Sequence, residues 1–394
     1  MKPALAVLLL AAAARADSLH VPADFASIQA AVDAAQAGDE VVVAAGTYEE
    51  TVALVDREDI TLRGQGKVVL HGGNSETAVV TLSLCTGVRV ERLRFEQPAF
   101  AAVEVVTSTG TTLSRCCVDG SGGDGLSLVD CTLSVVERCE VEDPAGVGVE
   151  VVGCTDTLVF RCRVERPGEV AIDIAGGDVS HVERCTLLDS PSFALLLESP
   201  HGTVLDNLIK TAVNGGIDVS GAFADVRDNR LIAAGDVPVR VESFGASSTV
   251  EDNRIVKPVD TGLLVQAVNV VVRRNRVIKS EASGIGLFAD DPLVTDNVVL
   301  HAVNTGFLTG TVTAGTLSGN RALHCGDSGF LIGGSGLLVH GNEAKGSGLD
   351  GFFVVEGPHV FTYNLAKGSG LFDLQDSSGA ANVYVGNTFP TIEP

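Results

Sequence analysis

Apolar and polar positions recur along this chain in a six-residue pattern that returns every 22 to 24 residues. The pattern is an apolar residue, two variable residues, Asn or Cys, one variable residue and a second apolar residue, as in VLDNLI around Asn207. A constant period in the twenties indicates one structural unit stacked many times. We call the Asn or Cys position the Asn/Cys column, and it contains Leu93, Cys116, Cys139, Cys162, Cys185, Asn207, Asn229, Asn253, Asn275, Asn297, Asn320, Asn342, Asn364 and Asn387.

Each repeat contains short stretches in which apolar and polar residues alternate, such as 149–151 and 172–174, separated by turns that contain glycine. Alternation with a period of two predicts β-strands. A leucine-rich repeat is disfavoured, because its L-x-x-L-x-L pattern is absent and three strands leave no room for a helix. The sequence predicts an all-β parallel β-helix of about 13 to 14 rungs, where a rung is one turn of the coil and equivalent residues on neighbouring rungs lie about 4.8 Å apart.

We expect the Asn/Cys column to build the coil and not to form a functional site. Asn tolerates the left-handed backbone of a tight turn, and stacked amides can hydrogen-bond from rung to rung. Cys131 and Cys154 form a second cysteine column, 23 residues apart. We expect buried, reduced thiols rather than disulfides, because the parallel Cβ vectors of stacked residues fit disulfide geometry poorly.

With these repeats the chain resembles the right-handed parallel β-helix (PbH1-repeat) proteins of the pectin-lyase-like superfamily. The repeats cover about 88–389, and the segment SIQAAVDAAQAGDEVVVAAGTYEETVALVDREDITLRGQG (27–66) is similar to the start of pectin methylesterases and of many exported β-helix proteins. The resemblance implies a right-handed coil, as the crossover rule for parallel strands also does. It does not imply one activity, because the superfamily includes lyases, hydrolases, esterases, epimerases and non-enzymes.

The first 16 residues have the pattern of a cleavable signal peptide. Lys2 precedes an apolar run over 4–14, and Ala14-Arg15-Ala16 fits a cleavage site. This run is too short to span a bilayer, and no later apolar run is long enough. We therefore expect cleavage after Ala16, a secreted or periplasmic protein and no membrane span.

The mature chain is expected to have a cap over 17–40 and a β-helix domain over 41–394. Phe25, Ile28, Val32 and Ala35 have the spacing of one face of a short helix. Such a helix would seal the end of the coil, where unpaired strand edges otherwise favour aggregation. The far end shows no comparable cap, so we expect a monomer or end-to-end association.

Composition limits the classes of partner. Without Lys2 and Arg15 the chain has 25 basic and 50 acidic residues, a net charge near −25. This charge disfavours nucleic acid and anionic membranes as partners. The chain has no Trp, which weakens any claim of sugar binding by aromatic stacking, and no C-x-x-C pair that would indicate a zinc site.

Counting from the Asn/Cys column predicts which side chains share a surface. Positions +10 and +12 are apolar and face inward, so +11 and +13 should face solvent on the strand called PB1, which in polysaccharide-active relatives carries catalytic and Ca²⁺-binding residues. Position +11 reads Glu104, Ser127, Glu150, Asp173, Leu196, Asp218, Arg240, Leu264, Gly286, Leu308, Leu331 and Phe353. Position +13 adds Glu198 and Glu242. The middle of this face is therefore charged and its later part apolar.

Three kinds of chemistry are open to the charged part. Glu150 and Asp173, one rung apart, repel each other and would favour a hard cation such as Ca²⁺ between them. Asp173 and Asp218, two rungs or about 9.6 Å apart, lie near the upper limit for an inverting pair in glycoside hydrolysis. Arg240 could bind a uronate carboxylate, or act as a base as the pectate-lyase resemblance implies. The competing interpretation is the solvated face of an acidic protein.

A second group lies at +4, in the turn before PB1. It consists of Lys257, Lys279, His301 and His324 on four successive rungs. Stacked cations are unfavourable unless an anion or solvent separates them. A polyanionic chain along the coil axis would use them, and solvated surface charge is the alternative.

The regular spacing favours binding over catalysis. Polysaccharide-degrading relatives carry long loops that enclose sugars, but no interval between Leu93 and Asn387 exceeds 24 residues. The tetrapeptide Gly326–Gly329, a match to a serine-protease motif, aligns with turns in neighbouring repeats. We expect a binding or scaffold module that contacts extended polysaccharide or cell-envelope material along PB1, with no cofactor other than Ca²⁺. The alternative is a lyase or glycoside hydrolase on an acidic polysaccharide, using Asp173, Asp218 and Arg240.

Overall fold

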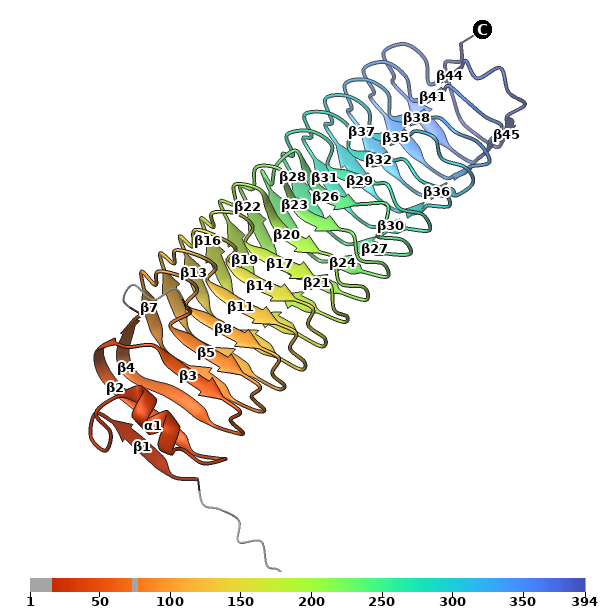
Figure 1. Cartoon of the computed structure of the whole chain (residues 1–394). Coiled ribbons are helices and arrows are strands. Elements are labelled where there is room, and N and C mark those ends of the chain that lie inside the picture. The colour runs from red at the N-terminus through yellow and green to blue at the C-terminus, as the bar shows by residue number, and fades with distance from the viewer. Residues whose placement is uncertain (1–15, 73–76, 394) are drawn as a thin grey trace, which may run out of the picture.

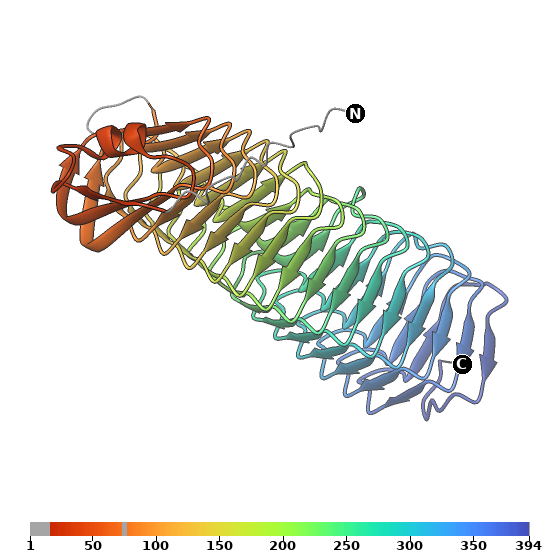
Figure 2. The ribbon, with the colours of Figure 1, turned by 90° about the horizontal axis from the view of Figure 1, so that it is seen from below.

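The computed structural model describes residues 16–72 and 77–393 and is an elongated parallel β-helix (Figure 1). Sheet B has 15 strands, no more than one from any rung, and sheet A has 30 strands. Over most of the coil sheet A takes two strands from each rung, which we call columns A1 and A2 in chain order. Figure 2 shows the same stacking from below, with the strands of successive rungs lying side by side. The predicted fold class is confirmed.

Sheet B is the predicted PB1. Its strands are β3 Val52–Val55, β5 Val80–Ser83, β8 Val103–Val106, β11 Leu126–Val129, β14 Val149–Val152, β17 Ile172–Ala175, β20 Phe193–Leu197, β23 Gly215–Val219, β26 Val237–Val241, β29 Leu263–Val265, β32 Ile285–Leu287, β35 Phe307–Thr309, β38 Phe330–Ile332, β41 Phe352–Val354 and β44 Leu374–Asp376.

Column A1 precedes the Asn/Cys column in the rungs that have it. Its strands are β1 Ser18–Val21, β2 Glu40–Glu49, β4 Thr61–His71, β6 Arg89–Glu91, β9 Thr112–Ser114, β12 Val135–Glu137, β15 Leu158–Phe160, β18 His181–Glu183, β21 Thr203–Leu205, β24 Asp225–Arg227, β27 Thr249–Glu251, β30 Val271–Arg273, β33 Leu293–Thr295, β36 Thr316–Ser318, β39 Leu338–His340, β42 Val360–Thr362 and β45 Val383–Val385.

Column A2 follows the Asn/Cys column. Its strands are β7 Arg94–Glu96, β10 Cys117–Asp119, β13 Glu140–Glu142, β16 Arg163–Glu165, β19 Thr186–Leu188, β22 Leu208–Lys210, β25 Arg230–Ile232, β28 Arg254–Val256, β31 Arg276–Ile278, β34 Val298–Leu300, β37 Arg321–Leu323, β40 Glu343–Lys345 and β43 Leu365–Lys367. In the first rungs the long strands β2 and β4 run through without the bend, and β4 pairs with both β6 and β7.

The rungs are more numerous than the 13 to 14 expected, because the rungs that contain β3 and β5 lack the Asn/Cys pattern by which they were counted. The stacking itself is as predicted. Asn229 lies between Asn207 and Asn253: Asn207 Nδ2 donates to Asn229 Oδ1, and Asn229 Nδ2 donates to Asn253 Oδ1, each at 3.0 Å. The same ladder continues to Asn387.

The expectation that Asn itself adopts the left-handed backbone is wrong. The left-handed residue is the one before it, with φ of 55° at Asp206, 57° at Asp228 and 55° at Asp252. The chain therefore bends between columns A1 and A2 one position earlier than expected. This bend leaves the next side chain buried, so that its amide can reach the neighbouring rungs.

The core is a stack of inward-facing apolar side chains enclosed by the two sheets. Phe307, Phe330 and Phe352 stack in register inside sheet B, with ring centroids 4.8 and 4.7 Å apart. All nine cysteines are free thiols, and only Cys117 among them is not fully buried. The expectation of buried, reduced cysteine columns agrees with this arrangement.

The first helix covers the beginning of the coil, as the spacing of its apolar residues predicts. Helix α1 spans Ile28–Ala34, and the Ser27 side chain caps it by accepting a hydrogen bond from the Ala30 N–H at 3.2 Å. Ile28, Ala31 and Val32 are buried against the first strands. The expected signal peptide lies almost entirely outside the described residues. Within the described chain, no helix combines the length and hydropathy needed to cross a bilayer.

Candidate functional site

The charged +11 residues lie in one row on the outer face of sheet B. Strand pairing puts Glu150 beside Asp173, Asp173 beside Leu196, Leu196 beside Asp218, and Asp218 beside Arg240. The structure therefore brings together the residues that the repeat count aligned. Leu196 separates Asp173 from Asp218, so the two carboxylates are not direct neighbours.

Arg240 is held by carboxylates on both sides. Its Nε donates to Asp218 Oδ1 at 2.9 Å, and its Nη2 also contacts Asp218 Oδ2 and lies 2.9 Å from Glu242 Oε1. The guanidinium lies 4.7 Å from the centroid of the Phe193 ring. The hydrogen bonds that Arg240 donates to Asp218 raise the pKa of Arg240, so this side chain stays charged. This pairing does not favour Arg240 as a base.

Asp173 is the carboxylate with the most unusual environment in this row. Its pKa is raised to about 6, first by burial and then by the negative charges of Glu198, Glu150, Asp124 and Glu169, in that order. Its Oδ1 is buried and has no hydrogen-bond partner. A carboxyl group with such a pKa exchanges protons near neutral pH, which makes it the best candidate for a functional acid on this face.

The Ca²⁺ expectation at Glu150 and Asp173 stays a prediction. The two are paired neighbours in sheet B, and Glu150 Oε2 accepts a hydrogen bond from Ser127 Oγ at 2.8 Å. Among the residues that the structure describes, no group of three or more His, Cys, Asp or Glu side chains is arranged to hold a metal ion. Two carboxylates supply fewer oxygen ligands than Ca²⁺ prefers.

The later part of the sheet B face is apolar and hollowed. Leu264, Leu308, Leu331 and Phe353 continue the row. Phe288, the residue directly after β32, is 41% exposed. Two adjoining open cavities of about 300 and 460 Å³ lie here and share Thr311, Val355 and Glu356. The sequence predicted the apolar row. It did not single out Phe193, Asp124 or Glu169, because these come from strand ends and turns outside the +11 and +13 positions.

The +4 residues lie on a different part of the coil. Lys257, Lys279, His301 and His324 each follow an A2 strand and occupy a left-handed turn position, with φ between 56° and 58°. The rings of His301 and His324 stack at 5.5 Å between centroids. The predicted stripe therefore exists, but it borders column A2 and is not part of the sheet B row.

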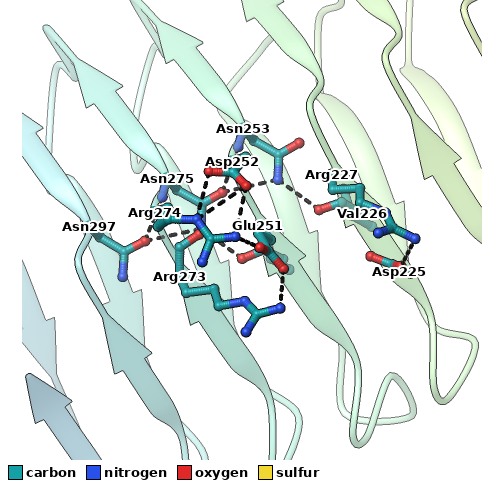
Figure 3. A network of polar contacts seen from close by, with 11 residues as sticks. Asp225, Val226, Arg227, Glu251, Asp252, Asn253, Arg273, Arg274, Asn275 and Asn297 are labelled. Atoms are coloured by element: carbon teal, nitrogen blue, oxygen red, sulfur yellow. Dashed lines mark hydrogen bonds and ion pairs between the residues drawn. The ribbon is translucent and has the colours of Figure 1, made fainter.

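A further cluster of charges on column A1 is structural. Glu251, whose side chain is 10% exposed, contacts both Arg273 and Arg274 (Figure 3). Arg274 also binds Asp252 at 3.0 Å. Each charge in this cluster faces an opposite one on the next rung, so the cluster leaves no charge for a ligand.

Comparison with known proteins identifies the family. The family model described as "right handed beta helix region" matches residues 101–255, 174–321 and 241–389. The chain belongs to this right-handed β-helix family. Because the model is right-handed, the expected handedness is confirmed. A search of curated proteins finds no match.

Several solved structures are similar to the chain. An alginate lyase from Paenibacillus sp. is 14% identical, with 75% of this chain and 99% of the lyase covered and a TM-score of 0.46. The catalytic domain of a GH87 α-1,3-glucanase in complex with nigerose is 10% identical, with 94% and 68% covered and a TM-score of 0.47. A family 28 exopolygalacturonase from Yersinia enterocolitica is 10% identical, with 95% and 76% covered and a TM-score of 0.44. At these identities the similarity says nothing about the ligand of this chain.

Proposed function

We propose that this protein is an exported binding module that contacts an extended polysaccharide or cell-envelope glycan along the outer face of sheet B. The observation that carries the proposal is the row from Glu150 to Arg240, in which charged groups lie in register on an open surface. Carboxylates accept hydrogen bonds from sugar hydroxyls, and Glu150, Asp173 and Glu198 supply acceptors on successive rungs. The signal-peptide pattern of the first 16 residues supports export.

The open surface favours binding over chemistry. The described segments that join the strands stay short from rung to rung, and the coil has a uniform outline (Figure 1). Enzymes that stabilise a charged transition state enclose it to exclude water. An open row instead makes many weak contacts with a long ligand, and these contacts add up along the chain.

The test is binding to a panel of neutral and acidic polysaccharides by the full mature chain. For a polysaccharide that binds at sheet B, we expect Asp173→Ala combined with Arg240→Ala to abolish binding, because the change removes one acceptor and the cation that orients Asp218 and Glu242. Glu104→Ala is the matched control, since Glu104 occupies the same row three rungs before Asp173. Sheet B would be removed as the site if every polysaccharide that binds the wild type binds the double variant equally well.

Glycoside hydrolysis is the second candidate, and the raised pKa of Asp173 is the observation that favours it. A carboxylic acid that is half protonated near pH 6 can protonate a leaving-group oxygen. Reducing ends and absorbance at 235 nm, which detects lyase products, would be followed on uronans, pectins and neutral glucans with and without Ca²⁺. Product formation that Asp173→Asn abolishes would establish the enzyme, whereas no product from any polymer would exclude it.

A further inference from the structure

Column A2 carries an exposed ladder of arginines in its middle rungs. Strand pairing places Arg230 of β25 beside Arg254 of β28, and Arg254 beside Arg276 of β31. All three side chains point to solvent, because the residue that follows each of them is buried in the core. Three cations are thus stacked at the spacing of neighbouring strands, about 4.8 Å.

A second row, of two lysines and two histidines, runs parallel to this ladder. It consists of the +4 residues Lys257, Lys279, His301 and His324, which lie three positions after the arginine row along the chain. Between the two rows lie half-buried aliphatic side chains, which are Ile232, Val256, Ile278 and Leu300. We call this surface the basic strip: an aliphatic floor with cations along both sides.

The cations of the basic strip lack the partners that other cations of column A2 have. Among the described residues, no ion pair involves Arg230, Arg254, Arg276, Lys257 or Lys279. Nearer the first helix, the same column pairs Arg163 with Glu165, and Arg166 with Glu142 and Asp143. The nearby Asp252 is already bound by Arg274 from column A1.

Unpaired stacking of like charges is unfavourable in a protein whose net charge is −23 and in which acidic partners are plentiful. A ligand that carries one negative charge for each unit along its length would remove this repulsion. Apolar surface on the same ligand would pack against the aliphatic side chains between the two rows. A linear polymer of acidic sugars has both the regular negative charges and the apolar surface, because its carboxylates lie at the edges of sugar rings whose faces are apolar.

We propose that the basic strip binds an acidic polysaccharide along the coil axis, on a face separate from sheet B. Nucleic acid fits the surface less well, because the strip has no Phe, Tyr or Trp on which bases stack. The two faces differ in charge, so that one coil can hold an acidic chain at column A2 and another glycan at sheet B. The inference does not depend on the function proposed for sheet B.

The experiment measures calorimetric binding of a galacturonate oligosaccharide to the mature chain at low salt, with neutral dextran as a comparison. Replacing Arg254, Arg276, Lys257 and Lys279 by Gln should weaken binding by roughly tenfold or more, because exposed ion pairs contribute modestly and four are lost. The control replaces four cations outside the strip that have acidic partners, namely Arg94, Arg163, Arg166 and Arg184, and changes the net charge equally. Its affinity should stay close to that of the wild type.

Three results would overturn the proposal. The wild type fails to bind the galacturonate, or the control loses as much affinity as the strip variant, or single-stranded DNA or anionic lipid vesicles bind more tightly than the galacturonate. Circular dichroism of both variants excludes misfolding as the cause of a loss. Galacturonate binding that is lost in the strip variant and retained in Asp173→Ala/Arg240→Ala is binding at the strip, which separates this result from the test of sheet B.

Discussion

A single amide side chain in the Asn/Cys column connects three rungs. Asn253 Oδ1 accepts hydrogen bonds from both the backbone N–H and the Nδ2 of Asn229, each at 3.0 Å. Its own Nδ2 donates to Val226 O at 2.8 Å and to Asn275 Oδ1 at 3.0 Å. Because all of these groups are buried, their hydrogen bonds cannot be replaced by water.

Replacing Asn253 by Leu should therefore destabilise the coil. The change leaves the Asn229 N–H and the Val226 carbonyl without these partners, and we expect the free energy of unfolding to fall by about 2–4 kcal/mol. Urea denaturation measures this loss. Asn387→Leu is the control, because Asn387 lies at the end of the ladder and is more exposed, so its loss should be smaller. Equal losses at the two positions would contradict the role of the ladder.

Asp173 should make stability depend on pH. Its folded-state pKa of about 6 lies above the usual 3.8, so the folded state binds the proton more tightly than the unfolded state. This contribution is fully present below about pH 4 and is lost as pH rises through about 6. Asp173→Asn should remove that dependence and make the protein more stable at pH 7 than the wild type. Denaturation at pH 4, 5 and 7 tests this, and a wild type that is more stable than the variant at pH 7 contradicts it.

At the scale of elements, helix α1 caps the first rungs of the coil. The side chains of Ile28, Ala31 and Val32 are buried there, and Glu50 from the next segment accepts hydrogen bonds from the Ile28 N–H at 2.9 Å and the Gln29 N–H at 3.2 Å. Rungs of a solenoid contact only their neighbours, so destabilising the cap formed by helix α1 should have only a local effect.

Ile28→Ala combined with Val32→Ala should loosen the first rungs and leave the middle of the coil intact. We expect a loss of about 2–5 kcal/mol in local stability, because both changes remove buried methyl groups. Hydrogen exchange would show faster exchange in β1, β2 and β4 and unchanged exchange in β28 and β31. Ala30→Ser, on the exposed side of the helix, is the control. Faster exchange throughout the coil would show that the rungs unfold together.

The elements also show what the sequence could predict. The inward-facing positions, the Asn ladder and the +11 row follow from the repeat period of the sequence. The sequence alone therefore predicts that Asp218 and Arg240 are neighbours. The position of the left-handed residue was missed by one, because a bend at Asp228 or at Asn229 gives the same repeat. The environment of Asp173 was not predictable, since Asp124 and Glu169 lie in turns whose direction the periodic pattern does not determine. For the same reason the sequence did not show that the arginines of column A2 lack acidic partners, because ion pairing depends on where the surrounding side chains lie.

At the scale of the whole molecule, the coil is a long rod whose faces carry different charges. Sheet B changes from acidic around Asp173 to apolar around Leu308, and column A2 changes from paired charges around Arg163 to unpaired cations around Arg254. Such gradients along the axis suit a ligand that is itself long, since each added unit meets one more rung.

Calorimetric binding of an oligosaccharide series of increasing length, from the polysaccharide selected by the panel, tests this account most directly. We predict that affinity for the mature chain rises with each added sugar across several rungs of sheet B, that Asp173→Ala/Arg240→Ala removes the rise, and that the recovered oligosaccharides keep their original length. Affinity that stops increasing after one or two sugars, or shortened oligosaccharides after incubation, would contradict a binding module that reads an extended chain along its axis.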